Sequence, residues 1–429
     1  MKSLSSLCLA LLIALGAAAP ARAQEFRTDI NPALLYYQSF LLAPDLPKAD
    51  QDYLFDGQEW LRGQKLPERF GKLISYYGKQ LRYARRAAAS TVPCDWGIDL
   101  GPGPETLLPH LAKCKRIAQA GRLRAMWALQ EGRPEDARED LIACLALGRN
   151  SSRDGTLIAA LVQMAVENIV CSTVAENYFQ LPPETLKQLS DAIEAAPTRG
   201  TVATSIGTEE KSFFLGWFDK KVEKLQKENP GNETKVLAGI KELFSPLEPS
   251  NEGDAPPSTE PSVWERTLKA AGGTVDGILK LAQEMPPLYT RLAAVMALPQ
   301  PEYEVQVKQF YAEVAASKNP LVPAMLAPLE KCRDKEFVTL AQLAMVHAAV
   351  EFKLHGQAGL KTVPDPCGNG PFAFERFVFE GVDRGFQLRS AYKGRGYPVV
   401  MIFVEKDGPA FNVAGQKAGQ SAAKPATAK

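Results

Sequence analysis

Two histidines and a glutamate follow one another at intervals of four residues in the last third of the chain, at His347, Glu351 and His355. Imidazole and carboxylate groups are ligands of zinc. In a helix, however, a rise of about 1.5 Å per residue separates the two histidines by about 12 Å along the axis. Both cannot then bind one ion at about 2 Å. We therefore predict neither a bound metal nor a cofactor.

The sequence lacks the motifs that mark common catalytic and nucleotide-binding sites. There is no G-x-S-x-G, no G-x-x-x-x-G-K-[ST], no H-E-x-x-H and no G-x-G-x-x-G. The 3 histidines leave few ways to build a histidine-based triad. Paired carboxylates of the kind that hydrolyse glycosides stay open, because the chain has 49 Asp and Glu residues. The sequence therefore identifies no catalytic residue.

Cysteines outside the N-terminal apolar stretch are even in number, which in an exported protein predicts disulfides. They are Cys94, Cys114, Cys144, Cys171, Cys332 and Cys367. Pairing in sequence order would join a loop to a helix through Cys94 and Cys114, one helix to the next, and the last helix to the C-terminal module. The alternative for Cys144 and Cys171, which lie on apolar stripes, is that both are buried as small hydrophobic residues.

Three aromatic residues are candidates for a binding surface, namely Tyr36, Tyr77 and Trp96. Trp96 lies in the Pro- and Gly-rich stretch 92–104, which predicts a loop, and loop aromatics often serve binding. The alternative is that all three are core residues, with the tyrosine hydroxyls near the surface.

The first 23 residues have the pattern of a secretory signal peptide. Lys2 precedes an apolar run from Leu7 to Ala19, and Ala21-Arg22-Ala23 resembles an A-x-A cleavage site. The run is shorter than the roughly 20 residues that cross a bilayer. We expect export to the periplasm or the extracellular space, cleavage before Gln24, and no transmembrane segment in the mature chain.

Residues 104–196 are predicted to form the centre of the fold, as four helical runs without a strand between them. Within them, apolar residues recur at helical spacing from Ile117 to Arg149, stop at Glu131-Gly132 and resume at Pro134, which suits a first helical position. Two helices joined this tightly fold back antiparallel, and each needs a further helix to cover its apolar face.

Small residues beside this turn, such as Ala128 and Ala137 on either side of Gly132, resemble a tetratricopeptide repeat (TPR). The resemblance covers about one repeat and implies an array of helical hairpins, TPR-like or α-solenoid-like. The alternative is a plain hairpin in a helix-rich domain. We expect an N-terminal helical array over 24–200 and a second helical region over 201–358, with a disordered loop at 246–262 that is rich in Pro, Ser and acidic residues.

The chain changes from helical to β character near residue 359. The stretches 363–374 (VPDPCGNGPFAF) and 385–390 (GFQLRS) resemble the ending of type II secretion pseudopilins, and more closely the same ending on uncharacterised exported helical proteins of bacteria. The resemblance and the alternating apolar residues predict a small antiparallel β-meander over 359–408, followed by a disordered tail at 409–429. Pseudopilins retain a long apolar first helix, which this chain lacks, so pilus assembly is not implied.

The balance of charge argues against nucleic acid as a partner. The chain has 50 Lys and Arg against 49 Asp and Glu, and phosphate neutralisation needs a basic surface. Two functions remain. The first is an exported helical scaffold whose partner is a protein or peptide. The alternative is a hydrolase of an envelope polymer that uses paired carboxylates within an aromatic groove.

Overall fold

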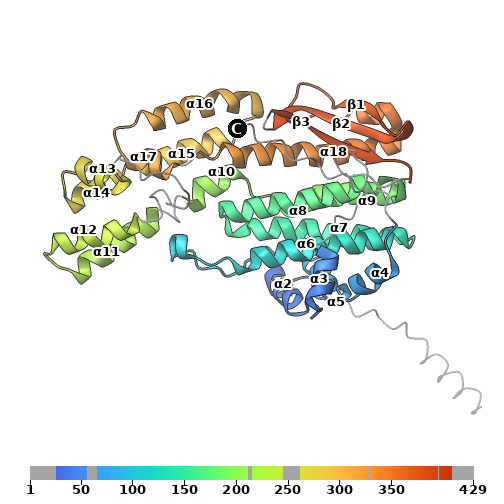
Figure 1. Ribbon diagram of the computed structural model, residues 1–429, viewed down its shortest axis with the longest axis horizontal. Helices are drawn as coiled ribbons and strands as arrows, with labels where there is room; N and C mark the ends of the chain where they lie inside the picture. Colours follow the sequence, from blue (N-terminus) through green and yellow to red (C-terminus); the bar gives the residue numbers. More distant parts are fainter. Residues whose placement is uncertain are drawn as a thin grey trace, which may run out of the picture.

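The computed structural model describes residues 26–55, 65–210, 215–244, 261–326, 328–394 and 396–407. These residues are mainly helical and end in a three-stranded antiparallel sheet (Figure 1). The predicted fold class, mainly α with a small C-terminal β-meander, is therefore confirmed, whereas a regular array of repeats stays a prediction. The predicted leader, most of the loop predicted at 246–262 and the predicted tail lie outside the described residues.

Four long helices form the centre of the molecule, where four helical runs are predicted. They are α6 (Pro109–Gln130), α7 (Pro134–Ser151), α8 (Leu157–Glu176) and α9 (Pro183–Ala195), with the short η2 (Ser152–Asp154) and η3 (Tyr178–Gln180) between them. Gly132 takes a φ of +71° in the turn between α6 and α7. These two helices approach so closely that a Cβ on Gly121 would lie 2.2 Å from Sγ of Cys144. The absence of a side chain at Gly121 thus sets the spacing of the hairpin.

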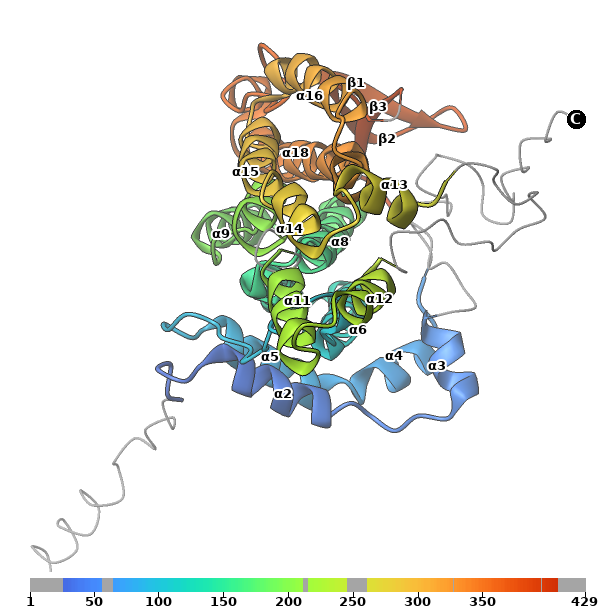
Figure 2. The same ribbon diagram turned by 90° about the vertical axis from the view of Figure 1, so that its left-hand side faces the viewer.

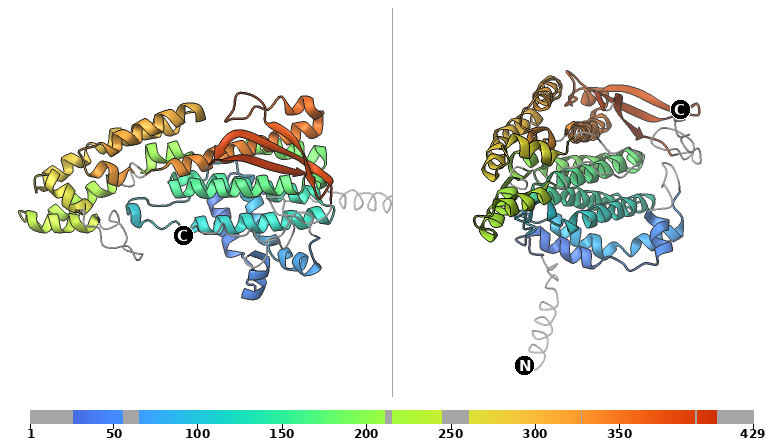
Figure 3. Two further views of the ribbon diagram at one scale, coloured as in Figure 1. Left: turned by 45° about the horizontal axis from the view of Figure 1, so that its top comes forward. Right: turned by 60° about the vertical axis from the view of Figure 1, so that its left-hand side comes forward.

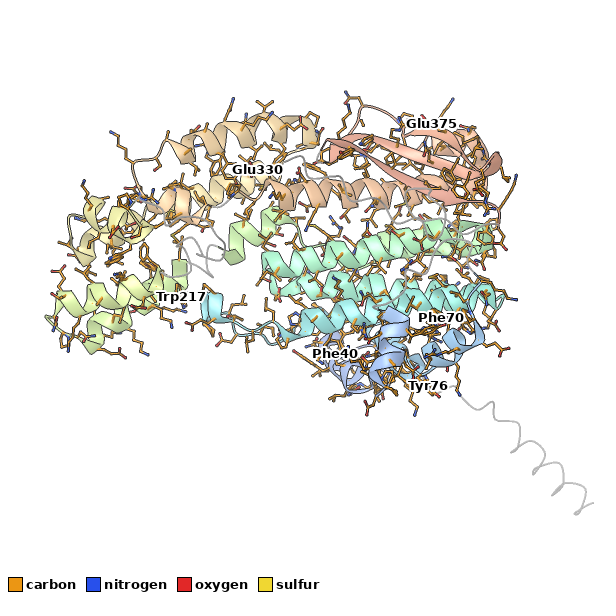
Figure 4. The ribbon with its side chains drawn as sticks, in the orientation of Figure 1. Phe40, Phe70, Tyr76, Trp217, Glu330 and Glu375 are labelled. Atoms are coloured by element: carbon orange, nitrogen blue, oxygen red, sulfur yellow. The ribbon has the colours of Figure 1, made fainter. Side chains whose placement is uncertain are left out.

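The N-terminal helices cover the side of α6 and α7 that faces away from α8 (Figure 2). They are α2 (Pro32–Leu41), α3 (Lys48–Phe55), α4 (Glu68–Ser75) and α5 (Gly78–Ala88), followed by η1 (Gly103–Glu105). Asn31 caps α2 by accepting a hydrogen bond from the backbone N–H of Ala33 at 3.1 Å. Phe40 and Phe70, labelled in Figure 4, belong to the aromatic layer that these helices bury against α6.

A group of shorter helices extends the molecule at one end (Figure 1). It comprises α10 (Val202–Thr204), η4 (Ser205–Glu210), α11 (Trp217–Glu228), α12 (Glu233–Leu243), α13 (Val263–Ala270), α14 (Val275–Ala282), α15 (Met285–Met296), α16 (Gln300–Ala315) and α17 (Leu321–Met325). Trp217 packs on Gly103 of η1, where a Cβ would lie 2.4 Å from the indole Cγ. This contact joins the extension to the loop that precedes α6.

The longest helix, α18 (Glu330–Leu360), runs beside α8 and α9 and leads into the sheet (Figures 1 and 3). Gly356 interrupts its helical geometry with a φ of 63° and a ψ of −148°. The sheet has the order β1 (Ala373–Phe379), β2 (Val382–Gly394) and β3 (Tyr397–Val404), and all pairs are antiparallel. The register shifts within β2 between Arg389 and Lys393. β3 is an edge strand.

Two hydrophobic cores meet at α6 and α7. The larger core joins residues of α6–α9 with residues of the extension, of α18 and of the sheet. The smaller core lies between the N-terminal helices and the opposite faces of α6 and α7. The helical regions and the meander that the sequence divides at 200 and 358 therefore contribute to one shared core.

Two stretches in the described part of the chain are long and apolar enough to cross a membrane, by length and composition alone. They are Leu157–Glu176, which is α8, and Leu321–Leu360. About half of each apolar window is buried inside the fold, 56% and 50% respectively. Core helices of soluble proteins meet the same criterion, so the expectation of no transmembrane segment stays a prediction.

Candidate functional site

The three aromatic residues that the sequence offers as a binding surface are buried in the smaller core. Tyr36, Tyr77 and Trp96 expose 0%, 4% and 5% of their surface. The Trp96 indole N–H donates to the carbonyl oxygen of Asn150 at 2.7 Å, and its ring stacks on Tyr36. The Tyr36 hydroxyl accepts a hydrogen bond from the side chain of Asn150. Because all three are buried, and the polar atoms of Tyr36 and Trp96 are bonded internally, these residues close a core rather than line a surface.

The predicted disulfides are not seen among the six cysteines. Cys94, Cys114, Cys144, Cys171 and Cys367 are buried, and Cys332 is half-buried. Burial raises the pKa of Cys94 and that of Cys367 to about 12, so both thiols carry their proton at neutral pH. Cys144 and Cys171 lie in the larger core at 0% exposure, which matches the alternative of small hydrophobic residues.

The histidines on α18 pair with separate carboxylates. His347 Nδ1 lies 2.9 Å from Oγ of Ser190 and 3.4 Å from a carboxylate oxygen of Glu194. His355 Nε2 lies 3.8 Å from Glu351. Among the described residues, no group of three His, Cys, Asp or Glu side chains is arranged to hold a metal ion. The spacing of four residues therefore reflects one face of a helix.

A groove of about 690 Å³ opens where α6, α8 and α18 meet the turn between β2 and β3. It lies on the side of the helix stack where the sheet runs alongside α18 (Figure 3). Its lining residues are Lys115, Gln119, Leu161, Met164, Ala165, Asn168, Ile169, Asp334, Lys335, Val338, Thr339, Gln342, Gly394, Tyr397, Pro398, Val399 and Val400. We treat this groove as the candidate functional site.

Helical spacing explains why these side chains meet. Leu161, Met164, Asn168 and their neighbours on α8 recur at intervals of three and four residues and so form one stripe. Residues 334, 338 and 342 form the facing stripe on α18. Most apolar members of the two stripes are only half-buried. The floor of the groove is therefore an apolar surface between two packed helices.

Two hydrogen bonds hold the polar groups of the groove. The side-chain N–H of Asn168 donates to Oε1 of Gln342 at 2.7 Å across the floor. The hydroxyl of Tyr392 donates to Oδ1 of Asp334 at 2.7 Å at the sheet end. Burial raises the pKa of Tyr392, and the hydrogen bond to Asp334 raises it further. The tyrosine is therefore a neutral donor at physiological pH, and the carboxylate of Asp334 already has a partner.

The charge of the groove is positive. Lys115 on α6 and Lys335 on α18 are exposed, and neither forms an ion pair with another residue of the described chain. Asp334 is the one carboxylate among the residues that line the groove. The two ammonium groups outnumber the one carboxylate, so the lining carries a small net positive charge beside an apolar floor.

A buried ionic network locks the two helices that form the floor. Glu167, which precedes Asn168 on α8, has 0% exposure and binds the guanidinium groups of Arg149 at 3.2 Å and Arg199 at 2.8 Å. Arg199 also lies 4.0 Å from Glu336 on α18. On α8, Glu167 belongs to the network and the adjacent Asn168 lines the groove. On α18, Glu336 belongs to the network and the adjacent Lys335 lines the groove. The network fixes the distance across the floor.

Sequence reasoning missed this groove, because its lining comes from four segments between residues 115 and 400. The one local signal is the placement of Asn168 and Gln342 within otherwise apolar helical stripes. In comparisons with protein-family models, with curated proteins and with solved structures, no match to the chain was found. The resemblances to TPR and pseudopilin sequences therefore stay predictions, and the function has to be argued from the groove.

Proposed function

We propose that this protein is an exported helical scaffold that binds a segment of another protein, or a peptide, in the groove between α6, α8, α18 and the β2–β3 turn. A volume of about 690 Å³ is in the range of natural ligand sites, which is about 300–1,000 Å³. The groove is bordered by rigid helices, whose relative position is set by the network around Glu167. A preorganised site of this kind loses little conformational entropy when a partner binds.

The observation that carries the proposal is the combination of an apolar floor with two exposed lysines that form no ion pair within the described chain. Leu161, Ile169 and Val338 are half-buried and supply apolar surface, and Lys115 and Lys335 supply positive charge. Recognition sites commonly combine a mostly apolar lining with a few polar groups that fix orientation.

The composition of the lining favours binding over hydrolysis. Glycoside hydrolysis needs two carboxyl groups about 5–10 Å apart. Asp334 is the one carboxylate among the lining residues, and it accepts a hydrogen bond from the neutral hydroxyl of Tyr392. The aromatic residues expected in a polymer-binding groove, Tyr36, Tyr77 and Trp96, lie in a separate core. The lining of this groove therefore favours the scaffold over the hydrolase.

Selection of peptides from a random display library on the purified chain tests the proposal. We expect recurrent sequences whose binding to the variant Val400→Arg falls by at least about tenfold, because the new side chain enters the groove from β3. The matched control is Val305→Arg on α16, since Val305 is 55% exposed and does not line the groove. Selected peptides that bind both variants equally, or a selection that yields no binder, would contradict the proposal.

Export is the second part of the proposal and is supported by the leader pattern at 1–23. Determination of the N-terminus of the protein isolated from cells that produce it tests this part. We expect Gln24 as the first residue, in the periplasmic or extracellular fraction. A chain that starts at Met1 and is recovered from the cytosol would contradict it.

A further inference from the structure

The outer side of the N-terminal helices carries a second surface, which is separate from the groove. We propose that the exposed faces of α2 and α5 bind an anionic lipid membrane. Leucines of α2 would enter the lipid interface, and basic residues of α5 would contact the phosphate groups of the lipids. This surface goes beyond the proposed function and does not depend on it.

One face of α2 exposes a row of apolar side chains. Leu34, Tyr37 and Leu41 follow one another at intervals of three and four residues, so they lie on one side of the helix. They expose 56%, 36% and 86% of their surface. The buried residues of α2, such as Ala33 and Tyr36, lie on the opposite side. Exposed apolar residues that are grouped in this way mark binding surfaces.

The neighbouring helix carries a row of positive charge. Lys79, Arg82 and Arg86 have the same spacing on α5, opposite its buried residues Leu81 and Ala84. The first two are exposed and the third is half-buried. In the described part of the chain, none of the three forms an ion pair. Neither α2 nor α5 contains an acidic residue.

Hydrogen bonds hold the two rows side by side. Oγ of Ser39 on α2 donates to the carbonyl oxygen of Gln80 on α5 at 2.9 Å, and the side-chain N–H of Gln80 donates to the carbonyl oxygen of Ser39 at 3.2 Å. The buried sides of both helices belong to the smaller core, which also includes α6 and α7. Both helices lie at the bottom of the molecule in Figures 1 and 2. The two rows therefore form one outward face.

An aromatic residue extends this face at the start of the described chain. The guanidinium group of Arg86 lies 4.5 Å from the centre of the Phe26 ring. Phe26 is itself 58% exposed. An exposed aromatic ring beside a cation is suited to the interface between lipid tails and headgroups, where aromatic and basic side chains both gather.

The described carboxylates among residues 26–100 lie outside the two rows. Three of them form ion pairs with a nearby cation, namely Asp29, Asp50 and Asp52. The others are exposed and lie on neither helix, namely Asp45, Glu68, Asp95 and Asp99. The two rows therefore offer a partner apolar side chains and cations without a carboxylate between them.

This chemistry favours a lipid surface over a folded protein as the occupant. Charged residues, lysine above all, are depleted at the centre of protein interfaces. At a membrane, leucine enters the interface while lysine and arginine stay at the level of the headgroups. Each cation near an anionic leaflet also adds to the affinity. A row of leucines beside a row of cations meets both requirements.

Flotation with lipid vesicles tests the inference. The protein that begins at Gln24, the expected mature chain, is used because the leader is itself apolar. One set of vesicles contains phosphatidylglycerol and phosphatidylcholine in equal parts, and the other contains phosphatidylcholine alone. Two double variants address the two rows: Leu34→Ser with Leu41→Ser, and Lys79→Gln with Arg82→Gln.

Each variant has a control with the same chemical change elsewhere on the surface. Ile158→Ser with Val305→Ser matches the leucine variant, because these residues are 60% and 55% exposed. Lys235→Gln with Lys308→Gln matches the cation variant, because both lysines are exposed on α12 and α16. Urea denaturation checks that each protein keeps its fold. If the leucine variant does not, Leu41→Ser alone replaces it, since Leu41 is 86% exposed.

We expect the unchanged chain to bind the anionic vesicles at least about tenfold more tightly than the neutral ones. The leucine variant should lose at least about tenfold on the anionic vesicles, because less apolar surface enters the interface. The cation variant should lose at least about tenfold on the anionic vesicles and stay within about twofold on the neutral ones. Both controls should stay within about twofold of the unchanged chain.

No binding of the unchanged chain to anionic vesicles would overturn the inference, and so would an equal loss in a variant and its control. A loss in the cation variant without one in the leucine variant would show attraction by charge alone, which contradicts the entry of α2 into the interface. Val400→Arg alters the groove and should leave binding to vesicles unchanged. Failure of this inference is therefore distinguishable from failure of the proposed function.

Discussion

Asn168 on α8 donates a hydrogen bond of 2.7 Å to Oε1 of Gln342 on α18, 174 residues further along the chain. The bond crosses the floor of the groove and is half-buried. We expect a double-mutant cycle with Asn168→Ala and Gln342→Ala to give a coupling of about 1 kcal/mol in the free energy of unfolding. The control cycle pairs Asn168→Ala with Gln283→Ala at the C-cap of α14 and should be additive within about 0.5 kcal/mol. Additivity in both cycles would show that the two amides do not interact in solution.

The close approach of α6 and α7 predicts that a larger side chain at Gly121 destabilises the fold. A Cβ at Gly121 would lie 2.2 Å from Sγ of Cys144, so Gly121→Ala forces the helices apart and should destabilise the fold by about 1–3 kcal/mol. Adding Cys144→Ala removes the sulfur and should recover part of this loss. Gly78 on α5 is the matched control, because a Cβ there meets nothing within 4 Å.

Chemical denaturation measures these differences. Gly78→Ala should be neutral or stabilise the fold by up to about 1 kcal/mol, since alanine favours the helix. Equal effects of the substitutions at Gly121 and Gly78 would mean that close packing at Cys144 does not limit the hairpin.

The same hairpin shows what local sequence predicts well. The apolar spacing from Ile117 to Arg149, interrupted at Gly132 and restarted at Pro134, is enough to predict two antiparallel helices, because these signals act within a few residues. The sheet was predictable for the same reason. Its turns coincide with Gly381 and Gly396, which both take positive φ.

The site was not predictable from the sequence, because tertiary contacts decide it. Trp96 lies in a loop with the composition of a surface segment, yet Asn150 offers its indole a buried acceptor. The even number of cysteines predicts disulfides. Whether a cysteine is instead buried depends on its neighbours in the fold, which the number of cysteines does not show. Lys115, Lys335 and Val400 lie far apart in the sequence. The packing of α18 on α8, with the sheet beside these helices, brings the three residues to one groove.

The buried carboxylate of Glu167 gives a prediction about the network behind the groove. Glu167→Ala would leave the guanidinium groups of Arg149 and Arg199 without their carboxylate partner, and we expect a loss of about 3–5 kcal/mol in stability. Glu167→Gln keeps the shape and one acceptor oxygen, so its loss should be smaller. Urea denaturation at neutral pH gives both values. A loss from Glu167→Ala of less than about 1 kcal/mol would show that water replaces the carboxylate and that the network does not hold α8.

Asp140 on α7 gives a prediction about pH. Its side chain has 0% exposure and accepts hydrogen bonds from Arg85 and Arg124 at 2.8 Å. Desolvation outweighs the two guanidinium groups and raises the pKa of Asp140 from 3.8 to about 6. Between these two values the folded state binds more protons at this group than the unfolded state does. The contribution of Asp140 to stability therefore falls as the pH rises through this window and is lowest above about pH 6.

The variant Asp140→Asn cannot titrate, so its comparison with the unchanged chain isolates this group. We expect the unchanged chain to lose on the order of 3 kcal/mol relative to Asp140→Asn as the pH rises from about 4 to 7. Urea denaturation of both proteins at several pH values gives the difference. If the two guanidinium groups outweighed desolvation, the pKa would lie below 3.8, and the unchanged chain would instead gain stability relative to the variant as the pH rises toward 4. A difference of that sign would contradict the prediction.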